Sequence, residues 1–191
     1  VLALRRDHLP EAYVAELERL HDRLPAMEAG AVAATIEAEL GEPPEQVFAS
    51  FSEVPLAAAT IAQVHAATLP DGRPVVVKVR RPGLEAQVAR DTATLAYLAA
   101  VAEDLAPRLR PLDLVGMVRE FRATLRREMD FRMEASSIRR FRAAMADVPG
   151  LWIPDVIPER STQAVLTLEH SPGERIDVFA ERHPETRAAL A

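Results

Sequence analysis

A single lysine stands out among the residues that could do chemistry. Lys78 lies within the run Pro74-Val75-Val76-Val77-Lys78-Val79-Arg80, and the 22 other cationic side chains of the chain are all arginine. An arginine serves at most solvated positions, so a lone lysine in a valine-rich strand favours a site that needs a compact, flexible ammonium group. A lysine placed by chance on an exposed strand face is the alternative, and the neighbouring sequence has to decide.

A carboxylate is the expected partner of such a lysine. Glu128 ends a predicted helix over 112–128, whose apolar seam consists of Leu114, Val118, Phe121 and Leu125. At about 100° per residue Glu128 falls on that seam, where an unpaired carboxylate is costly. We therefore expect Glu128 to pair either with Lys78 or with a nearby arginine, such as Arg126 or Arg132.

The elements around Lys78 are predicted to form a small antiparallel sheet. Strands over 63–69 and 75–79 are joined by a turn around Asp71-Gly72. The alternation of strand side chains places Lys78 and Val76 on one face. Two further strands are predicted over 153–158, which carries prolines, and over 163–168.

Helices are predicted to fill the remainder of the chain. Apolar spacing indicates helices over 1–24, 30–40 and 112–128, and a short helical turn from Pro43. Helical sequence continues after 128, with a break as one possibility, through Phe131 to Met145. Another helix is expected over 84–105, with Glu103 on its outer side and an apolar stripe of Val88, Leu95, Leu98 and Val101.

Composition and charge exclude several classes of protein. Hydrophobic residues make up 49% of the chain, enough for a core, and the lack of cysteine excludes disulfides and thiolate metal sites. The histidines lack metal-like spacing, and no apolar run reaches the roughly 18 residues of a membrane span. The net charge of −6 disfavours nucleic acid as a partner. Residues 108–142 are basic, with ten arginines against five acids, which suits either a solvated helix face or contact with phosphate or anionic lipid.

The order of these elements and three motifs resemble a known family. A loop, a hairpin with one lysine, helices with an inward acid and two more strands follow the order of a protein-kinase-like small lobe. The motifs at 55–65 (PLAAATIAQVH), 75–83 (VVVKVRRPG) and 128–135 (EMDFRMEA) resemble the alanine-rich loop, the lysine strand and the Glu-x-Asp region of the UbiB family of atypical kinases. This family is also called the aarF-domain or ADCK proteins, and the resemblance covers essentially the whole chain.

The resemblance implies a fold and a domain organisation. The expected fold is α+β, a kinase-like small lobe with an antiparallel sheet of about five strands, an N-terminal helical extension and inserted helices. The helical extension would cover 1–51, the lobe 52–168, and a hinge with the start of a large lobe 169–191. Val1 and Ala191 both lie in helix-like sequence, so we expect the chain to be part of a longer protein.

The resemblance also implies roles for individual residues. Lys78 would contact the nucleotide phosphates and Glu128 would hold Lys78, with Asp130, Glu134 and Gln63 in a supporting polar network. A loop would cover the phosphates, formed by Ala57, Ala58, Ala59, Thr60, Ile61 and Ala62. The hinge at Glu169 and His170 would meet adenine. Alanine restricts a loop that is glycine-rich in kinases. In the family this difference goes with suppressed protein-kinase activity, so the resemblance implies no phosphorylation of protein substrates.

The function implied is that of an ATP-binding atypical kinase or ATPase that supports isoprenoid quinone biosynthesis. The cofactors would be ATP and Mg²⁺, and the further partners a quinone precursor, anionic lipid or proteins of quinone biosynthesis. The expected location is the cytoplasm, with peripheral contact to the inner face of the plasma membrane. Because the sequence holds no His-x-Asp loop and no Asp-Phe-Gly-like motif, catalytic and metal-binding residues are expected only beyond this chain. The alternative is a non-catalytic pseudokinase or scaffold lobe that binds lipid or a partner protein.

Overall fold

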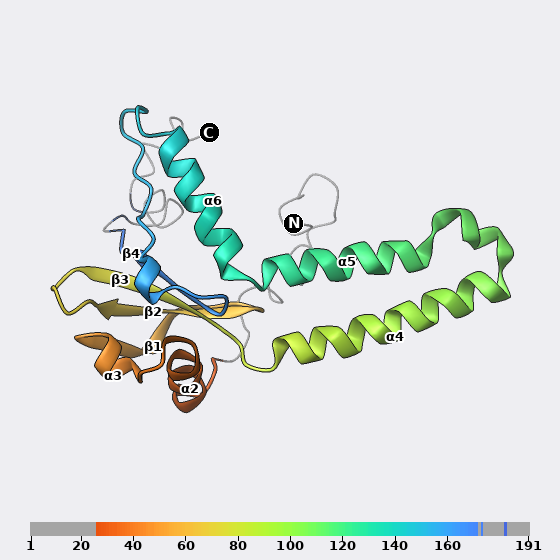
Figure 1. The fold of residues 1–191 in the computed structure, drawn as a ribbon, viewed down its shortest axis with the longest axis horizontal. Helices are drawn as coiled ribbons and strands as arrows, with labels where there is room; N and C mark the ends of the chain where they lie inside the picture. Colours follow the sequence, from red (N-terminus) through yellow and green to blue (C-terminus); the bar gives the residue numbers. More distant parts are fainter. Residues whose placement is uncertain (1–25, 172, 174–181, 183–191) are drawn as a thin grey trace.

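The computed structural model describes residues 26–171, 173 and 182. The helix predicted over 1–24 and most of the region after the predicted hinge lie outside these residues. The described fold is α+β, as predicted, with helices on both faces of one antiparallel sheet (Figure 1). None of the described helices has the length and apolar character needed to cross a bilayer.

The sheet has four strands in the order β1-β2-β3-β4. Their bounds are β1 Ser50–Ala58, β2 Ala62–Thr68, β3 Pro74–Arg80 and β4 Val165–Glu169. The strand predicted over 153–158 is reduced to one bridge between Val156 and Leu168. Pro154 and Pro158 cannot donate ladder hydrogen bonds, which explains why this segment does not form a full strand.

The face of the sheet opposite Lys78 forms the main hydrophobic core. Val75, Val77 and Val79 alternate with Lys78 along β3 and are buried against α2 (Ala29–Leu40). Helix α2 contributes Val32 and Ile36 to this core. It ends at Gly41, whose left-handed φ of 85° allows its N–H to bond Glu37 O, and α3 (Pro44–Val47) follows.

Helix α6 (Phe131–Ala144) covers part of the other face of the sheet. Phe131 and Ala135 are buried against Ala62 of β2 and Leu166 of β4. Lys78 lies on this second face, because Lys78 is directly paired with Leu166 in the ladder between β3 and β4. The sheet therefore separates a packed face from a face that is only partly covered.

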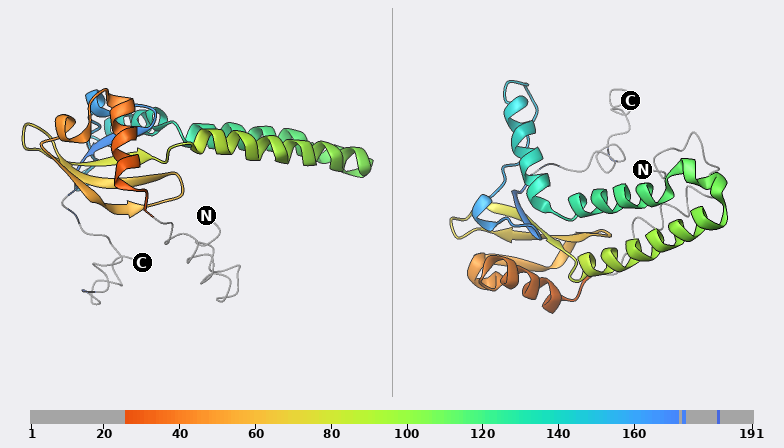
Figure 2. Two further views of the ribbon diagram at one scale, coloured as in Figure 1. Left: turned by 90° about the horizontal axis from the view of Figure 1, so that it is seen from below. Right: turned by 45° about the vertical axis from the view of Figure 1, so that its right-hand side comes forward.

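Two long helices project from the domain as a hairpin (Figures 1 and 2). Helix α4 (Leu84–Leu105) runs outward, the 3-10 helix η2 (Pro107–Leu112) turns the chain, and α5 (Leu114–Glu128) returns. A short 3-10 helix, η3 (Pro158–Arg160), precedes β4.

The face that α4 turns toward α5 differs from the predicted stripe. Thr92 and Ala99 are the buried residues of α4, whereas Leu95 and Leu98 are 44% and 55% exposed. Glu103, expected on the outer side, accepts a hydrogen bond from the Val115 N–H of α5 at 3.3 Å. Small side chains let two helices approach closely, and a hairpin covers only one narrow face of each helix, so the larger residues lie beside the contact.

We expect the packed face of the sheet to determine the stability of the domain. Ile36→Ala removes a fully buried side chain and should lower the free energy of unfolding by about 2–5 kcal/mol. Leu98→Ala on the hairpin should change it by less than about 0.5 kcal/mol. Urea denaturation measures both, and an equal loss for the two variants would contradict this assignment of the core.

Candidate functional site

Lys78 forms an ion pair with an acid of helix α6. Its Nζ donates a hydrogen bond to Glu134 Oε2 at 2.6 Å, and the two side chains are 30% and 41% exposed. The same ammonium lies 4.7 Å from the ring centroid of Phe131, within the range of a cation–π contact. Because both partners are partly solvated, the pair adds little stability, but it fixes the direction of a flexible side chain.

The carboxylate that holds Lys78 is Glu134, contrary to the prediction of Glu128. Glu128 is exposed at the end of α5. It does fall on the apolar seam of that helix, but Phe121 on the same seam is also exposed, so this flank is not packed. A break at Met129 and Asp130 ends α5 and begins α6 on a new course. The apolar spacing of α5 therefore does not predict which residue of α6 contacts Lys78.

Asp130 supports the site by starting the helix that carries Glu134. Its side chain caps α6 by accepting a hydrogen bond from the Arg132 N–H at 3.0 Å, and it pairs with the Arg132 guanidinium at 2.7 Å. The side-chain hydrogen bond from Arg132 is the main cause that lowers the pKa of Asp130, against the effect of burial, and the charge of Arg80 adds to it. Asp130 is thus an ionised N-cap.

Gln63 lies on the opposite face from Lys78, contrary to its predicted place in the supporting network. It pairs with Val79 across the ladder, so the alternation of strand side chains directs it into the packed face. There its amide lies 3.1 Å from His65 Nε2 and accepts a hydrogen bond from the Met27 N–H. His65 Nδ1 in turn lies 2.8 Å from Ser52 O. This buried network joins β1, β2 and the residue two before α2.

Half of the predicted loop over 57–62 is strand. Ala57 and Ala58 end β1 and Ala62 begins β2, so the connecting loop is only 59–61. Arg81 holds this loop to the end of β3: its N–H donates to Ile61 O at 2.8 Å and its Nε to Ala59 O at 3.0 Å. The loop is thus fastened to the strand that carries Lys78, and its role over phosphates stays a prediction.

An apolar surface borders Lys78 on the same face of the sheet. Val64 is directly paired with Lys78, and Val76 precedes it by two residues; both are half-buried. A flat apolar group could lie on these side chains while an anion meets the ammonium. The sequence prediction did not include Val64 in the site, although the period of two along β2 could have indicated it.

The described part of the predicted hinge lies at the end of β4. Glu169 pairs with Val75 of β3, and its N–H donates to Asp155 O at 2.9 Å. The His170 N–H donates to Pro74 O at 3.1 Å. Both backbone donors are therefore engaged within the protein, and contact with adenine stays a prediction.

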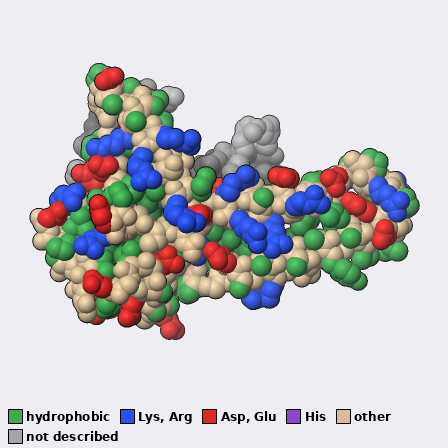
Figure 3. Space-filling view, viewed as in Figure 1, with side chains coloured by type: hydrophobic (Ala, Val, Ile, Leu, Met, Phe, Trp, Pro, Cys, Tyr) green, Lys and Arg blue, Asp and Glu red, His purple; other side chains and the backbone are tan. Residues whose placement is uncertain are grey.

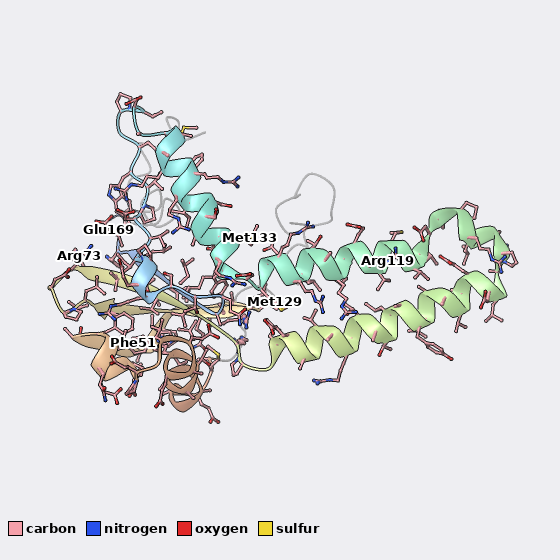
Figure 4. The ribbon with its side chains drawn as sticks, viewed as in Figure 1. Phe51, Arg73, Arg119, Met129, Met133 and Glu169 are labelled. Carbon is pink, nitrogen blue, oxygen red and sulfur yellow. The ribbon has the colours of Figure 1, made fainter. Side chains whose placement is uncertain are left out.

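Arg80 is a further residue of the site that the sequence prediction missed. It lies on the same face of β3 as Lys78, and its Nη1 donates to Met129 O at 2.7 Å. Met129 lies at the junction of α5 and α6 (Figure 4). An arginine two residues after the lysine could have been noticed in the sequence. Its target could not, because 49 residues separate Arg80 from Met129.

Comparisons with known proteins show the family to which the chain belongs. The sequence matches the ABC1 atypical kinase-like domain over residues 19–189. It is 42% identical over 179 residues to a probable protein kinase UbiB of Xylella fastidiosa (strain 9a5c), covering 91% of this chain and 31% of that protein. It is 35% identical to a probable protein kinase UbiB of Marinobacter nauticus, covering 91% of this chain and 32% of the relative. The chain thus spans about a third of the length of these relatives.

A solved structure has a similar fold. Rv3197 from Mycobacterium tuberculosis, in complex with erythromycin, has a TM-score of 0.67 and 28% sequence identity. The match covers 94% of this chain and 45% of that one. The elements that carry Lys78 and Glu134 therefore belong to a fold that recurs in a second protein.

We expect the ionised Asp130 cap to make stability depend on pH. The pKa of Asp130 lies below its ordinary value of 3.8 in the folded protein, so its contribution is present above that value and is lost as pH falls through the folded pKa. Asp130→Asn keeps a capping oxygen but loses the charge. It should cost less than about 1 kcal/mol at neutral pH, because Arg132 is exposed.

Urea denaturation of both proteins at neutral pH and at about pH 3 measures this effect. The difference between wild type and Asp130→Asn should shrink at the lower pH. A difference that stays constant across this range would contradict an ionised cap.

Proposed function

Because the chain belongs to the ABC1 atypical kinase-like family, we propose that it is the small lobe of an ATP-binding UbiB-type protein. The whole protein would act as an atypical kinase or ATPase that supports isoprenoid quinone biosynthesis. The observation that carries this proposal is the pair of Lys78 and Glu134 beside a half-buried apolar surface.

The described residues can bind the two ends of a nucleotide. The Lys78 ammonium would contact the α- and β-phosphates. Glu134 and Phe131 already orient it, so it would lose little conformational freedom when the phosphates bind. The base would lie on Val64 and Val76. Arg81 holds the loop 59–61 to the end of β3. By resemblance to the family, an alanine-rich loop at this place goes with nucleotide binding without transfer to protein substrates.

Magnesium does not fit these residues by themselves. The described residues hold no group of three or more His, Asp or Glu side chains that could bind a metal ion, and Glu134 is engaged by Lys78. When bound, Mg²⁺ would neutralise phosphate charge. We expect its ligands in the part of a full-length UbiB-type protein that this chain does not include.

The test is nucleotide binding by a full-length Lys78→Ala protein. The change removes a charge-assisted hydrogen bond of about 1.5–3 kcal/mol, so the dissociation constant for ATP should rise by about tenfold or more. Arg119→Ala is the matched control, because Arg119 is exposed on α5, in the hairpin that projects away from the sheet (Figure 4). Calorimetry measures both, and equal affinities for ATP in Lys78→Ala and wild type would remove Lys78 from the site.

A second candidate function is a binding lobe that contacts an anionic membrane. The hairpin exposes large apolar side chains, namely Leu95, Tyr97, Leu98, Leu105, Leu112, Met117 and Phe121. Arg side chains, interspersed with Asp and Glu side chains, lie along the face of the hairpin seen in Figure 3. A projecting element that exposes large apolar side chains together with arginines suits the interface of a bilayer with anionic lipid. This contact would place the protein at the inner face of the plasma membrane.

Vesicle co-sedimentation tests this second function. The protein should bind vesicles that contain phosphatidylglycerol, and salt should weaken the binding. Leu105→Glu at the end of α4 should reduce it, whereas Val54→Glu, a similarly exposed site on β1, should not. Binding that is absent, or equal for the two variants, would exclude the hairpin as a membrane contact.

A further inference from the structure

Arg80 is held more tightly than an ordinary surface arginine. Its side chain is only 11% exposed. Besides the hydrogen bond to Met129 O, its Nη1 forms an ion pair with Glu85 Oε1 of α4 at 2.9 Å. One side chain thus connects β3, the first turn of α4 and the junction between α5 and α6.

The junction that Arg80 binds sets the course of helix α6. Met129 is buried and ends α5, and Asp130 begins α6 as its N-cap. The Phe131 N–H donates to Gln163 O at 3.1 Å, which ties the junction to the segment before β4. Glu134 follows one turn later, so any rotation of α6 about this junction moves its carboxylate relative to Lys78.

We propose that Arg80 is a positioning residue that holds α6 so that Glu134 meets Lys78. The planar guanidinium can bond a backbone carbonyl and a carboxylate at fixed angles, whereas an ammonium lacks this geometry. Loss of the carbonyl bond frees the junction and lengthens the 2.6 Å contact between Lys78 and Glu134. The consequence for nucleotide binding rests on the proposed function; the effect on the ion pair does not.

The only lysine of the chain offers a direct readout of the ion pair. In protein labelled with ¹³C,¹⁵N-lysine, Lys78 gives the one lysine side-chain NMR signal. Arg80→Met should shift this signal toward the position seen in Glu134→Gln. Glu85→Gln is the matched control: it removes the ion pair of Arg80 but keeps its bond to Met129 O, so the Lys78 signal should stay in place. Arg80→Gln, which keeps a side-chain N–H donor and adds no second lysine, should give an intermediate shift and serves if Arg80→Met does not fold.

An unshifted Lys78 signal in a folded Arg80→Met protein, or in Arg80→Gln if Arg80→Met does not fold, would overturn the proposal. This readout needs no nucleotide, so it decides the role of Arg80 even if the protein binds no ATP. Failure of the wild type to bind ATP would instead count against the proposed function.

A double-mutant cycle on ATP affinity separates positioning from general destabilisation. If Arg80 acts through Glu134, Arg80→Met should weaken ATP binding by about tenfold, and should add nothing to the loss in Glu134→Gln. Losses that add in the double variant would show that Arg80 acts independently of Glu134.

Discussion

The ion pair between Lys78 and Glu134 can form only because the other described elements are arranged as they are. It joins residues that lie 56 positions apart, one on a strand and one on a helix. It exists because β3 turns Lys78 away from the packed core, and because α6 lies across that face of the sheet with Phe131 and Ala135 buried. A half-exposed ion pair of this kind contributes little to folding, so the fold positions the pair and not the reverse.

The two faces of the sheet divide stability from function. On one face the valines of β3, the core residues of α2 and the network of Gln63 and His65 are fully buried. On the other face Val64 and Val76 remain half-buried beside Lys78. A strand with a period of two can serve both purposes with one short sequence, which explains why a valine-rich run carries the single lysine.

The hairpin of α4 and α5 lies between the two halves of the site in the sequence. It leaves the sheet directly after the lysine strand and returns to the helix that carries Glu134 (Figure 1). Arg80 joins the two ends of the hairpin: it pairs with Glu85 in the first turn of α4 and bonds Met129 O, just after α5. This chain thus holds Lys78 and Glu134 together although a long projection separates them in the sequence.

The sequence by itself determined the family, the α+β class, the lysine strand with its hairpin and the approximate bounds of α2, α4, α5 and α6, because local periodicity and turn chemistry carry this information. It could not identify Glu134 as the partner of Lys78, exclude Gln63 from the site or find the contact of Arg80. The positions of these three residues depend on the break at Met129 and Asp130, on the strand register and on which face of each helix is covered. Such features arise from contacts between residues distant in sequence, and only the tertiary structure decides among arrangements that are locally equivalent.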